Sequence, residues 1–438
     1  MRIAWFTPYS TRSAIGDFSR HVTAALADQA DVDIWTADGP PLYGSHLRVI
    51  RFDANGESDV ALADYDAVVY NMGNYLPFHS AIHDVSQRHP GIVILHDRVF
   101  HHLFVRKWLG EAGAVDPMYV SRMAAYYGEA GARVARESVS GDRQPVWERD
   151  EEVVKYPLDE EPLRRALGAI THSEQHARYI RGRWLGPVRA LRHPAYRDVL
   201  AKGAGAGPLP PQRADGRLQL TTIGHVIANK HSDRVIRMLA ADATLAATVH
   251  YTIVGQVDEG EPYATELAGL LRSSPQVSAE MLGWCEEEEL DRLMAETDVF
   301  VNLRDPVMES GSGSLMRELA FGRPVLCFDG GCFGELPQGA VARVAAGDFD
   351  AAGAELRRLM SDAARRRELG AHARRLASEH GEPDYAQALI EFVAEVQRAT
   401  PTLRFLDRVG DELGAMRADP SLPIFDDIAS DFGRILAL

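Results

Sequence analysis

Short apolar segments alternate along the chain with amphipathic segments of helical period. In the first half, strands are predicted at 2–6, 31–36, 67–72, 91–96 and 169–173. An amphipathic helix is predicted at 16–29, and a mostly helical stretch at 99–168. The run Ile92-Val-Ile-Leu95 is apolar throughout, which suits a strand covered on both faces. This pattern predicts a parallel sheet with crossover helices.

The same alternation starts again in the second half. Strands are predicted at 218–223, at 249–254, up to residue 282 and at 299–303, and helices from 230, from 263 and at 286–295. Residues 201–212 are rich in Gly, Ala and Pro and lack periodicity, as linkers do. The sequence therefore predicts a doubly wound α/β domain at 1–200, a linker at 201–215, a second such domain at 216–385, and a helical tail at 386–438.

Composition narrows the class of protein. The chain has 438 residues, with 47 Lys and Arg against 63 Asp and Glu, a formal charge of −16. This acidic balance disfavours a general nucleic-acid binder, which needs a basic surface to meet phosphates. Three cysteines form neither a CxxC pair nor an even disulfide framework, which favours a reducing cytoplasm. The apolar run at 2–6 is too short for a signal peptide or a membrane span.

The most informative loop follows the strand predicted at 299–303. It contains Glu309, Ser310, Gly311, Ser312, Gly313 and Ser314. A short helix to Phe321 is expected after it, ended by Gly322 and Pro324. Glycines allow close approach of the backbone, and serines cap a helix whose free N–H groups attract anions. The loop suits a phosphate, and the alternative is a capped helix start without a ligand.

A second anion-binding candidate follows the strand at 218–223. Gly224 permits a turn there, and His225 and Lys230 are placed to face phosphates from the loop and the first helical turn. A lysine at a helix start is unfavourable for the helix dipole, which favours a function. The alternative is an ordinary solvated lysine. Because ligands bind at the carboxyl ends of parallel strands, the expected site is a cleft between the two sheets.

Loops of the first half carry further polar groups. The loop at 7–17 lacks the three-glycine dinucleotide fingerprint, so NAD binding has little support. The loops at 71–74 and 96–98 bring amide, imidazole and carboxylate groups to one rim, with turn chemistry and a local hydrogen bond as the alternative. The arginines between 178 and 192 are expected to be a solvated helix face, or else a contact for an anionic acceptor or membrane.

These residues together resemble the retaining nucleotide-sugar glycosyltransferases of the GT-B fold, specifically glycosyltransferase family 4. That family has two glutamates separated by seven residues around a Gly-x-Gly loop, followed by a Gly-x-Pro-Val stop. Here Gly311-Ser-Gly313, Glu318 and 321–325 match that pattern. The family's Gly-Arg turn and later lysine fall on Gly224, His225 and Lys230. Weaker matches are 253–255, 282–284, Gly16 and His96-Asp97, and the resemblance covers roughly residues 1–385.

The resemblance implies a GT-B fold, with two Rossmann-like domains facing a central cleft, and a role for each matching residue. Glu318 would bind the ribose, and Gly311 and Gly313 would offer N–H groups to the sugar and diphosphate. Lys230, helped by His225, would neutralise the leaving diphosphate. The donor-binding residues it implies are Gly16, Gly224, His225, Lys230, Gly283, Trp284, Ser310, Gly311, Ser312, Gly313, Ser314 and Glu318. The catalytic residues are Lys230, Glu309 and His96, with Asn74 and Asp97 on the acceptor side.

Two positions depart from the family pattern. The first glutamate of the motif falls on Ser310, with Glu309 one place early, and the family's arginine is His225, a weaker phosphate ligand.

The sequence predicts a cytoplasmic, metal-independent, retaining enzyme without a cofactor. It would transfer a hexose-type sugar from a UDP- or GDP-linked donor to a hydroxyl of a small-molecule, glycan or lipid-linked acceptor. The alternatives are a nucleotide-sugar epimerase of the same fold and a degenerate protein that binds nucleotide sugars without turnover. Binding of a nucleotide without transfer would favour the last of these.

Overall fold

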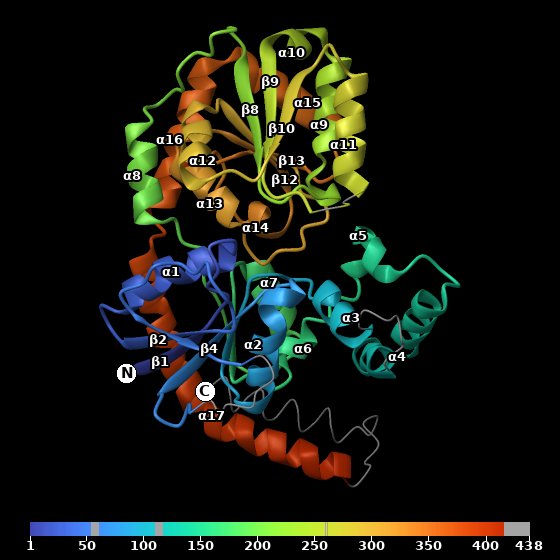
Figure 1. Ribbon diagram of the computed structural model, residues 1–438, viewed down its shortest axis with the longest axis vertical. Helices are drawn as coiled ribbons and strands as arrows, with labels where there is room; N and C mark the ends of the chain where they lie inside the picture. Colours follow the sequence, from blue (N-terminus) through green and yellow to red (C-terminus); the bar gives the residue numbers. More distant parts are fainter. Residues whose placement is uncertain (54–60, 110–116, 259, 261, 416–438) are drawn as a thin grey trace. The chain divides into compact units, whose positions relative to one another are not determined.

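The computed structural model describes residues 1–53, 61–109, 117–258, 260 and 262–415, and within these ranges the chain forms two compact units (Figure 1). The first unit contains Met1–Arg192, Met308–Gly311 and the chain from Pro383. The second contains His193–Val307 and Ser312–Glu382. The chain therefore passes from one unit to the other four times.

The first unit is built on a seven-stranded parallel sheet with the order β3-β2-β1-β4-β5-β6-β7. Its strands are β1 (Arg2–Phe6), β2 (Asp31–Thr36), β3 (Arg48–Arg51), β4 (Ala67–Met72), β5 (Ile92–Leu95), β6 (Gly168–Thr171) and β7 (Val188–Ala190). All four residues of β5 are buried, as the apolar run predicts. The sequence analysis missed β3 and β7, the two edge strands, because they are short and only partly buried.

Helices cover both faces of this sheet. They are α1 (Ala14–Leu26), α2 (Leu76–Arg88), α3 (His101–Leu109), α4 (Pro117–Ser140), α5 (Asp150–Val153), α6 (Glu160–Leu163), α7 (Glu174–Arg181) and α17 (Glu382–Ala415), with a 3-10 turn η1 (Val146–Glu148). Residues of α1 and α17 share one apolar cluster with β1, β5 and β6. Residues of α2, α3, α4 and α7 form the cluster on the other face. The unit is thus a three-layer α/β structure.

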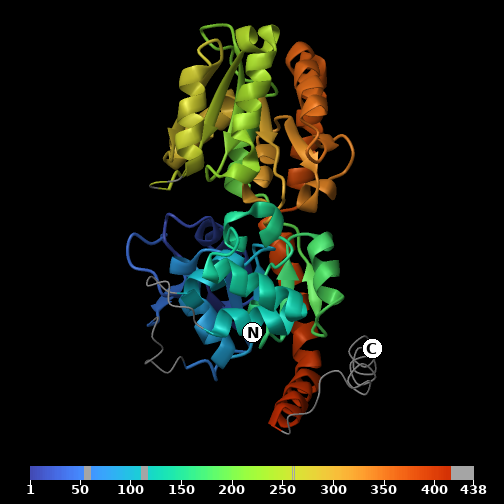
Figure 2. The same ribbon diagram turned by 90° about the vertical axis from the view of Figure 1, so that its right-hand side faces the viewer.

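The first part of α17 belongs to the core of the first unit. Tyr385, Leu389 and Phe392 follow each other at helical spacing and are at most 4% exposed. They pack with Phe18 and Ile170, so the helix is a structural layer of the unit. Figure 2 shows it beside the first sheet and continuing past it. The helix predicted at 385–398 is confirmed as part of α17, whereas the helix predicted at 426–438 lies outside the described residues.

The second unit contains a six-stranded parallel sheet with the order β10-β9-β8-β11-β12-β13. Its strands are β8 (Leu218–Ile223), β9 (Val249–Val254), β10 (Ser278–Gly283), β11 (Val299–Asn302), β12 (Val325–Asp329) and β13 (Ala342–Ala345). Its helices are α8 (Arg197–Gly205), α9 (Ser232–Ala241), α10 (Ala243–Thr248), α11 (Pro262–Ser273), α12 (Glu287–Glu296), α13 (Gly313–Ala320), α14 (Gly331–Gly334), α15 (Phe349–Ser361) and α16 (Ala363–Ser378), with a 3-10 turn η2 (Ala228–Lys230). Separate apolar clusters lie on the two faces of the sheet.

The first part of the predicted linker is helical. Residues 201–205 complete α8, which packs on α13 and α16. A Cβ atom on Gly203 would lie 2.3 Å from the carbonyl oxygen of Ala320, so glycine lets α8 approach α13. In the first part of this segment, a glycine that looks typical of a linker instead allows two helices to pack closely.

The longest described helices are α4, whose 24 residues are interrupted by a kink at Gly128, and α17, with 34 residues. Neither these two nor any other helix within the described ranges is both long and apolar enough to cross a membrane. The cytoplasmic location stays a prediction from the sequence.

The contact of α8 with α13 leads to a prediction about stability. We expect Gly203→Ala to lower the free energy of unfolding by about 1–3 kcal/mol, because the added methyl group meets fixed backbone atoms. Gly205→Ala in the same helix is the matched control, since a Cβ there meets nothing within 4 Å. Chemical denaturation of both variants measures the difference. Equal stabilities would show that α8 does not need this close approach.

Candidate functional site

Lys230 lies at the carboxyl edge of the second sheet, in the 3-10 turn between β8 and α9. The side chain is 6% exposed, and its Nζ donates a hydrogen bond to the carbonyl oxygen of Ile223 at 3.3 Å. Burial lowers its pKa well below the usual range, and the positive charge of Arg304 lowers it further. Gly224 makes room for this ammonium group, because a Cβ there would lie 2.6 Å from Nζ. A buried lysine beside a second cation is a costly arrangement, which an anion would relieve.

Arg304 is the second cation at this edge, two residues after β11. Its guanidinium donates to Asn302 Oδ1 at 2.7 Å and to Ser314 Oγ at 2.9 Å. The ring of Phe333 lies beneath it, with its centroid 5.7 Å away. These contacts fix the orientation of the guanidinium, whose planar fork suits phosphate oxygens.

Glu318 is the carboxylate of this cluster, and it is completely buried on α13. The amide of Asn302 donates to its Oε2 at 3.2 Å. Burial raises the pKa of Glu318 to about 7, although the Asn302 hydrogen bond and the charges of Arg304 and Lys230 oppose that rise. In this arrangement the carboxylate faces two cations and an amide. Its predicted contact with a ribose stays a prediction.

The N-terminus of α13 adjoins the cluster. Ser312 is the N-cap, and its Oγ accepts a hydrogen bond from the backbone of Leu315 at 3.2 Å. Ser314 Oγ lies 3.1 Å from Ser312 Oγ and also accepts from Arg304. The predicted strand, loop and capped helix, which ends before Gly322, is therefore confirmed. The helix dipole adds a favourable field for an anion beside Arg304.

His225 lies apart from this buried environment. Its side chain is 42% exposed, and Nε2 lies 3.1 Å from Oδ2 of Asp258. Gly255 packs on the preceding turn, because a Cβ there would lie 2.1 Å from the carbonyl oxygen of Gly224. The carboxylate neighbour competes with any phosphate for this imidazole. The help that His225 is predicted to give Lys230 stays a prediction.

Gly283 and Trp284 lie where the sequence predicts them, at the end of β10. Gly283 has a positive φ of 75°, and its carbonyl accepts from the backbone of Gly255 at 2.8 Å. The side chain of Trp284 is 55% exposed, which is unusual for tryptophan and leaves an aromatic face uncovered. Their predicted contact with a nucleotide base stays a prediction.

In the first unit, His96 follows β5 and takes part in a buried hydrogen-bond chain. Its Nε2 lies 3.0 Å from Asn71 Oδ1, and its Nδ1 lies 3.1 Å from Nε2 of His172. Asn71 Nδ2 donates to the carbonyl of Phe6 at 3.0 Å, and His172 Nδ1 lies 3.0 Å from the carbonyl of Leu191. Both nitrogens of each ring are therefore engaged.

The segment Met308–Gly311 packs on the first unit beside this chain. Glu309 forms an isolated antiparallel bridge with Asp97, and the backbone of Ser310 donates to the carbonyl of His96 at 2.9 Å. A Cβ on Gly311 would lie 2.3 Å from Cβ of His172. Packing on His172 is thus sufficient reason for glycine at 311. The catalytic role predicted for Glu309 stays a prediction.

The hydroxyl of Ser310 is completely buried. Its Oγ accepts from the backbone of His172 at 2.8 Å and lies 3.0 Å from Nδ1 of His176. Burial lowers the pKa of His176 to about 3, so its ring is neutral, and Nε2 lies 3.8 Å from Asp159 Oδ2. The order Asp159, His176, Ser310 resembles a hydrolase triad, but a fully covered serine cannot attack a substrate. This arrangement anchors the segment.

Structural contacts account for three further predicted residues. The backbone N–H of Asn74 donates to Asp97 Oδ2 at 2.7 Å, and Asn74 Oδ1 accepts from the backbone of Leu103 at 2.9 Å. Gly16 gives its N–H to the N-cap oxygen of Ser13 at 3.1 Å. These contacts are turn and cap contacts. The acceptor-side roles of Asn74 and Asp97 and the donor contact of Gly16 stay predictions.

The sequence analysis missed several polar residues at these two edges: Arg304, Asn302, His172 and His176. Arg304 and Asn302 stand at the end of a predicted strand, the position that was used to select the other candidates. His172 was included in a predicted strand as one of its residues. Most of their partners are distant along the chain, from Ser314, 10 residues after Arg304, to Ser310, 138 residues after His172. No local motif therefore indicates them.

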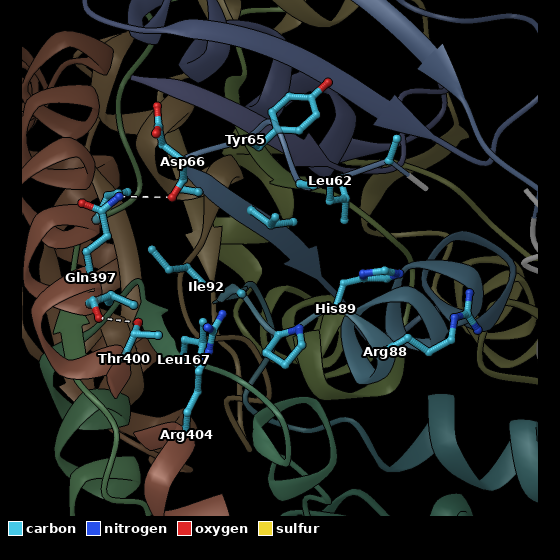
Figure 3. A pocket seen from close by; sticks show the side chains of 18 residues that line it. Leu62, Tyr65, Asp66, Arg88, His89, Ile92, Leu167, Gln397, Thr400 and Arg404 are labelled. Carbon is cyan, nitrogen blue, oxygen red and sulfur yellow. Dashed lines mark hydrogen bonds between the residues drawn. The ribbon is translucent and has the colours of Figure 1, made fainter. Parts of the chain in front are cut away.

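The first unit also contains a cavity of about 620 Å³ at the opposite edge of its sheet. It lies at the starts of β4 and β5, and α17 closes one side (Figure 3). Gln397 of that helix donates to the carbonyl oxygen of Asp66 at 3.1 Å, as Figure 3 shows. Parallel sheets bind ligands at the carboxyl ends of their strands, so this cavity differs from the predicted site. Residues of α17 form part of its wall.

Comparison with known proteins gives similarity in structure but not in sequence. No family model matches the chain, and no curated protein matches it in sequence. Sucrose-phosphate synthase from Thermosynechococcus elongatus is 15% identical, with a TM-score of 0.61 over 91% of this chain and 100% of that one. HepE from Anabaena, solved with UDP and glucose, is 16% identical, with a TM-score of 0.59 over 90% and 99%.

WaaG, described as a glycosyltransferase involved in lipopolysaccharide biosynthesis, is 13% identical, with a TM-score of 0.56 over 90% of this chain and 99% of that one. These structural neighbours are GT-B glycosyltransferases. The two Rossmann-like units with parallel sheets match them, so the predicted fold class is confirmed. At these identities the likeness shows the fold alone.

The buried carboxylate of Glu318 leads to a prediction about pH. The raised pKa means that the folded protein holds this proton between about pH 4.5 and 7, whereas the unfolded chain releases it. The free energy of unfolding therefore falls as pH rises through that window, by up to about 1.4 kcal/mol per pH unit from this group. Glu318→Gln should remove this part of the slope, as measured by denaturation from pH 4.5 to 7.

Glu368→Gln, at an exposed position of α16, is the control for loss of a carboxylate. An unchanged slope in Glu318→Gln would contradict the buried acid described above.

Proposed function

We propose that the protein is a glycosyltransferase that moves a sugar from a nucleoside diphosphate to a hydroxyl acceptor. The observation that carries the proposal is the buried Lys230 beside Arg304, at the N-terminus of α13 and the carboxyl edge of the second sheet. Two cations and a helix N-terminus converge where a parallel sheet binds its ligand. The GT-B fold supports the proposal, and HepE, a neighbour with that fold, was solved with UDP and with UDP-glucose.

In this proposal the two cations stabilise the leaving diphosphate. Negative charge builds up on the phosphate oxygens as the bond to the sugar breaks, so fixed positive charges act most strongly in the transition state. Arg304 supplies an oriented guanidinium, and Lys230 supplies a point charge from a site that excludes water. Asn302 accepts from Arg304 and donates to Glu318, so it links the guanidinium to the carboxylate.

The finer features rest on the resemblance to family 4. They are retention of the anomeric configuration, a reaction without a metal, and a hexose-type sugar. A uridine donor is favoured over a guanosine donor by the UDP complexes of HepE. Among the described residues no group of three or more His, Cys, Asp or Glu side chains is placed to hold a metal, and the metal-free reaction remains part of the proposal.

The direct test is incubation with UDP-, GDP- and dTDP-sugars, measuring release of the nucleoside diphosphate and analysing the sugar product. We expect release with at least one UDP-sugar, increased by a hydroxyl acceptor. Conversion of the donor without an acceptor would identify an epimerase instead. Binding of UDP without turnover would identify a degenerate binding protein. No binding of any donor would reject the proposal.

Lys230→Ala should lower kcat/KM by about 10²–10³-fold, because it removes charge stabilisation from the transition state. Lys202→Ala is the matched control. Lys202 is a partly exposed lysine of the same unit that pairs with Asp291 at 2.6 Å. Steady-state kinetics with the best donor measures both variants, and circular dichroism checks that they are folded. Equal kinetics in both would show that Lys230 does not face the donor.

Arg304→Ala should cause a similar loss, with Arg304→Lys recovering only part of it, because a lysine keeps the charge but not the fork. His225→Ala should change kcat/KM less than tenfold, since this imidazole is exposed and already lies beside Asp258. The same kinetics compare the three variants. A larger loss in His225→Ala than in Arg304→Ala would restore the role that the family pattern gives to His225.

A further inference from the structure

We propose that His96 and His172 together hold one proton more than two neutral imidazoles, so that the pair places a positive charge at the carboxyl edge of the first sheet. His172 acts as a positioning residue that keeps this charge on His96. The proton count rests on hydrogen bonds within the first unit. Its kinetic consequence rests on the proposed function.

The two ends of the hydrogen-bond chain fix its direction. At one end, the carbonyl oxygen of Leu191 can only accept, so His172 Nδ1 carries a hydrogen. At the other end, the carbonyl oxygen of Phe6 can only accept, so the amide nitrogen of Asn71 faces it. Asn71 Oδ1 therefore faces His96, and Nε2 of His96 must donate to it.

The contact between the two rings needs a third hydrogen. His96 Nδ1 and His172 Nε2 are 3.1 Å apart, and a hydrogen bond there requires a proton on one of them. Three N–H groups are thus needed, whereas two neutral imidazoles supply two. One imidazolium, shared across the ring contact, satisfies all three bonds. Without it, two lone pairs would face each other inside the protein.

Turning the amide of Asn71 does not remove the need for this proton without a cost. Its nitrogen would then donate to His96 Nε2, but Oδ1 would face the carbonyl oxygen of Phe6 at about the 3.0 Å of the present contact. Two acceptors would then oppose each other in a site where Asn71 is completely buried. The arrangement with the extra proton has no such conflict.

Groups from several elements surround the pair. Asp97 follows His96 in the loop after β5, and its carboxylate accepts from the backbone of Asn74. From α7, His176 is neutral, and its Nδ1 lies 3.0 Å from Ser310 Oγ, which accepts from the backbone of His172. From α17, the ring of Tyr385 lies 6.1 Å from that of His172, and burial keeps its hydroxyl protonated by raising its pKa. Phe18 of α1 contacts both rings.

Both nitrogens of His96 are used by Asn71 and His172, so the ring cannot serve as a proton acceptor for a substrate hydroxyl. The protonated ring of His96 can still interact with a ligand through its positive charge. A positive ring attracts a group that carries negative charge, such as a phosphate oxygen of the donor. Under the proposed function, His96 acts electrostatically and not as a general base.

The proton count can be measured without any activity. In protein labelled with ¹⁵N-histidine, nitrogens with and without a proton have distinct resonances, and His96→Gln and His172→Gln identify the signals of the pair. At pH 7.5 we expect one of the four ring nitrogens to lack a proton. Two nitrogens without protons would overturn the proposal, whether or not the protein is an enzyme.

Two substitutions separate charge from packing. In His172→Gln the amide can donate to Leu191 and accept from His96, so His96 should keep both protons. In His172→Phe no acceptor remains for His96 Nδ1, so His96 should lose one. His101→Gln is the control, because His101 is a buried histidine of the same unit whose pKa burial lowers to about 3 and whose ring contacts Tyr156 and Tyr119. It should leave the signals of the pair unchanged.

Stability against pH gives a second readout. The folded pair holds its extra proton above pH 6.5, where histidines of the unfolded chain lose theirs. The stabilisation is therefore lost as pH rises, and the folding equilibrium constant of the wild type relative to His172→Phe should fall about tenfold per pH unit above 6.5. A pH-independent ratio would contradict the extra proton.

If the proposed function holds, the alkaline limb of kcat/KM should move to lower pH in His172→Phe and stay in place in His172→Gln. If the two variants changed the alkaline limb of kcat/KM in the same way while the NMR count was as expected, the pair would hold the extra proton. That proton would then have no role in the reaction. Absence of any turnover with the expected NMR count would reject only the proposed function.

Discussion

The burial of charge at the carboxyl edge of the second sheet is the constraint on which its site depends. Lys230 and Glu318 are both buried. Burial lowers the pKa of Lys230 and raises the pKa of Glu318, because the surroundings solvate charge poorly. Arg304 and Asn302 join them through hydrogen bonds to α13 and to the carboxylate. Such a cluster favours binding of an anion, since the anion supplies the negative charge that the cations lack when Glu318 is protonated.

The polar groups at the carboxyl edge of the first sheet are of a different kind. There the polar groups are imidazoles and amides, and a chain of hydrogen bonds between two backbone carbonyls controls their protons. The segment Met308–Gly311 is fixed beside this chain by Ser310, which stands where the family pattern has a glutamate. A glutamate would need to place a larger, charged group in a position without exposure. The serine therefore fits the packing of the first unit.

The hydrophobic pattern was sufficient to predict nine of the strands, because a buried parallel strand produces an apolar run that is visible locally. It missed β3 and β7, whose residues are only partly buried and so have no such run. It also missed β12 and β13 of the second sheet. It also failed at α8, where Gly203 is required by the backbone of Ala320 in another helix. Composition cannot distinguish a glycine that packs closely from one that loosens a linker.

The sequence by itself determined that the chain forms two parallel α/β sheets, since strand periodicity is a local property. Loop composition, also local, selected the loops after β5, β8 and β11 as candidates for the site. Only the tertiary structure decided which of those groups meet. It brought Arg304 to Ser314 and Lys230, gave Met308–Gly311 to the first unit, and used α17 as a layer of that unit. It also set the charge states, because burial and hydrogen-bond partners come from residues far apart in the chain.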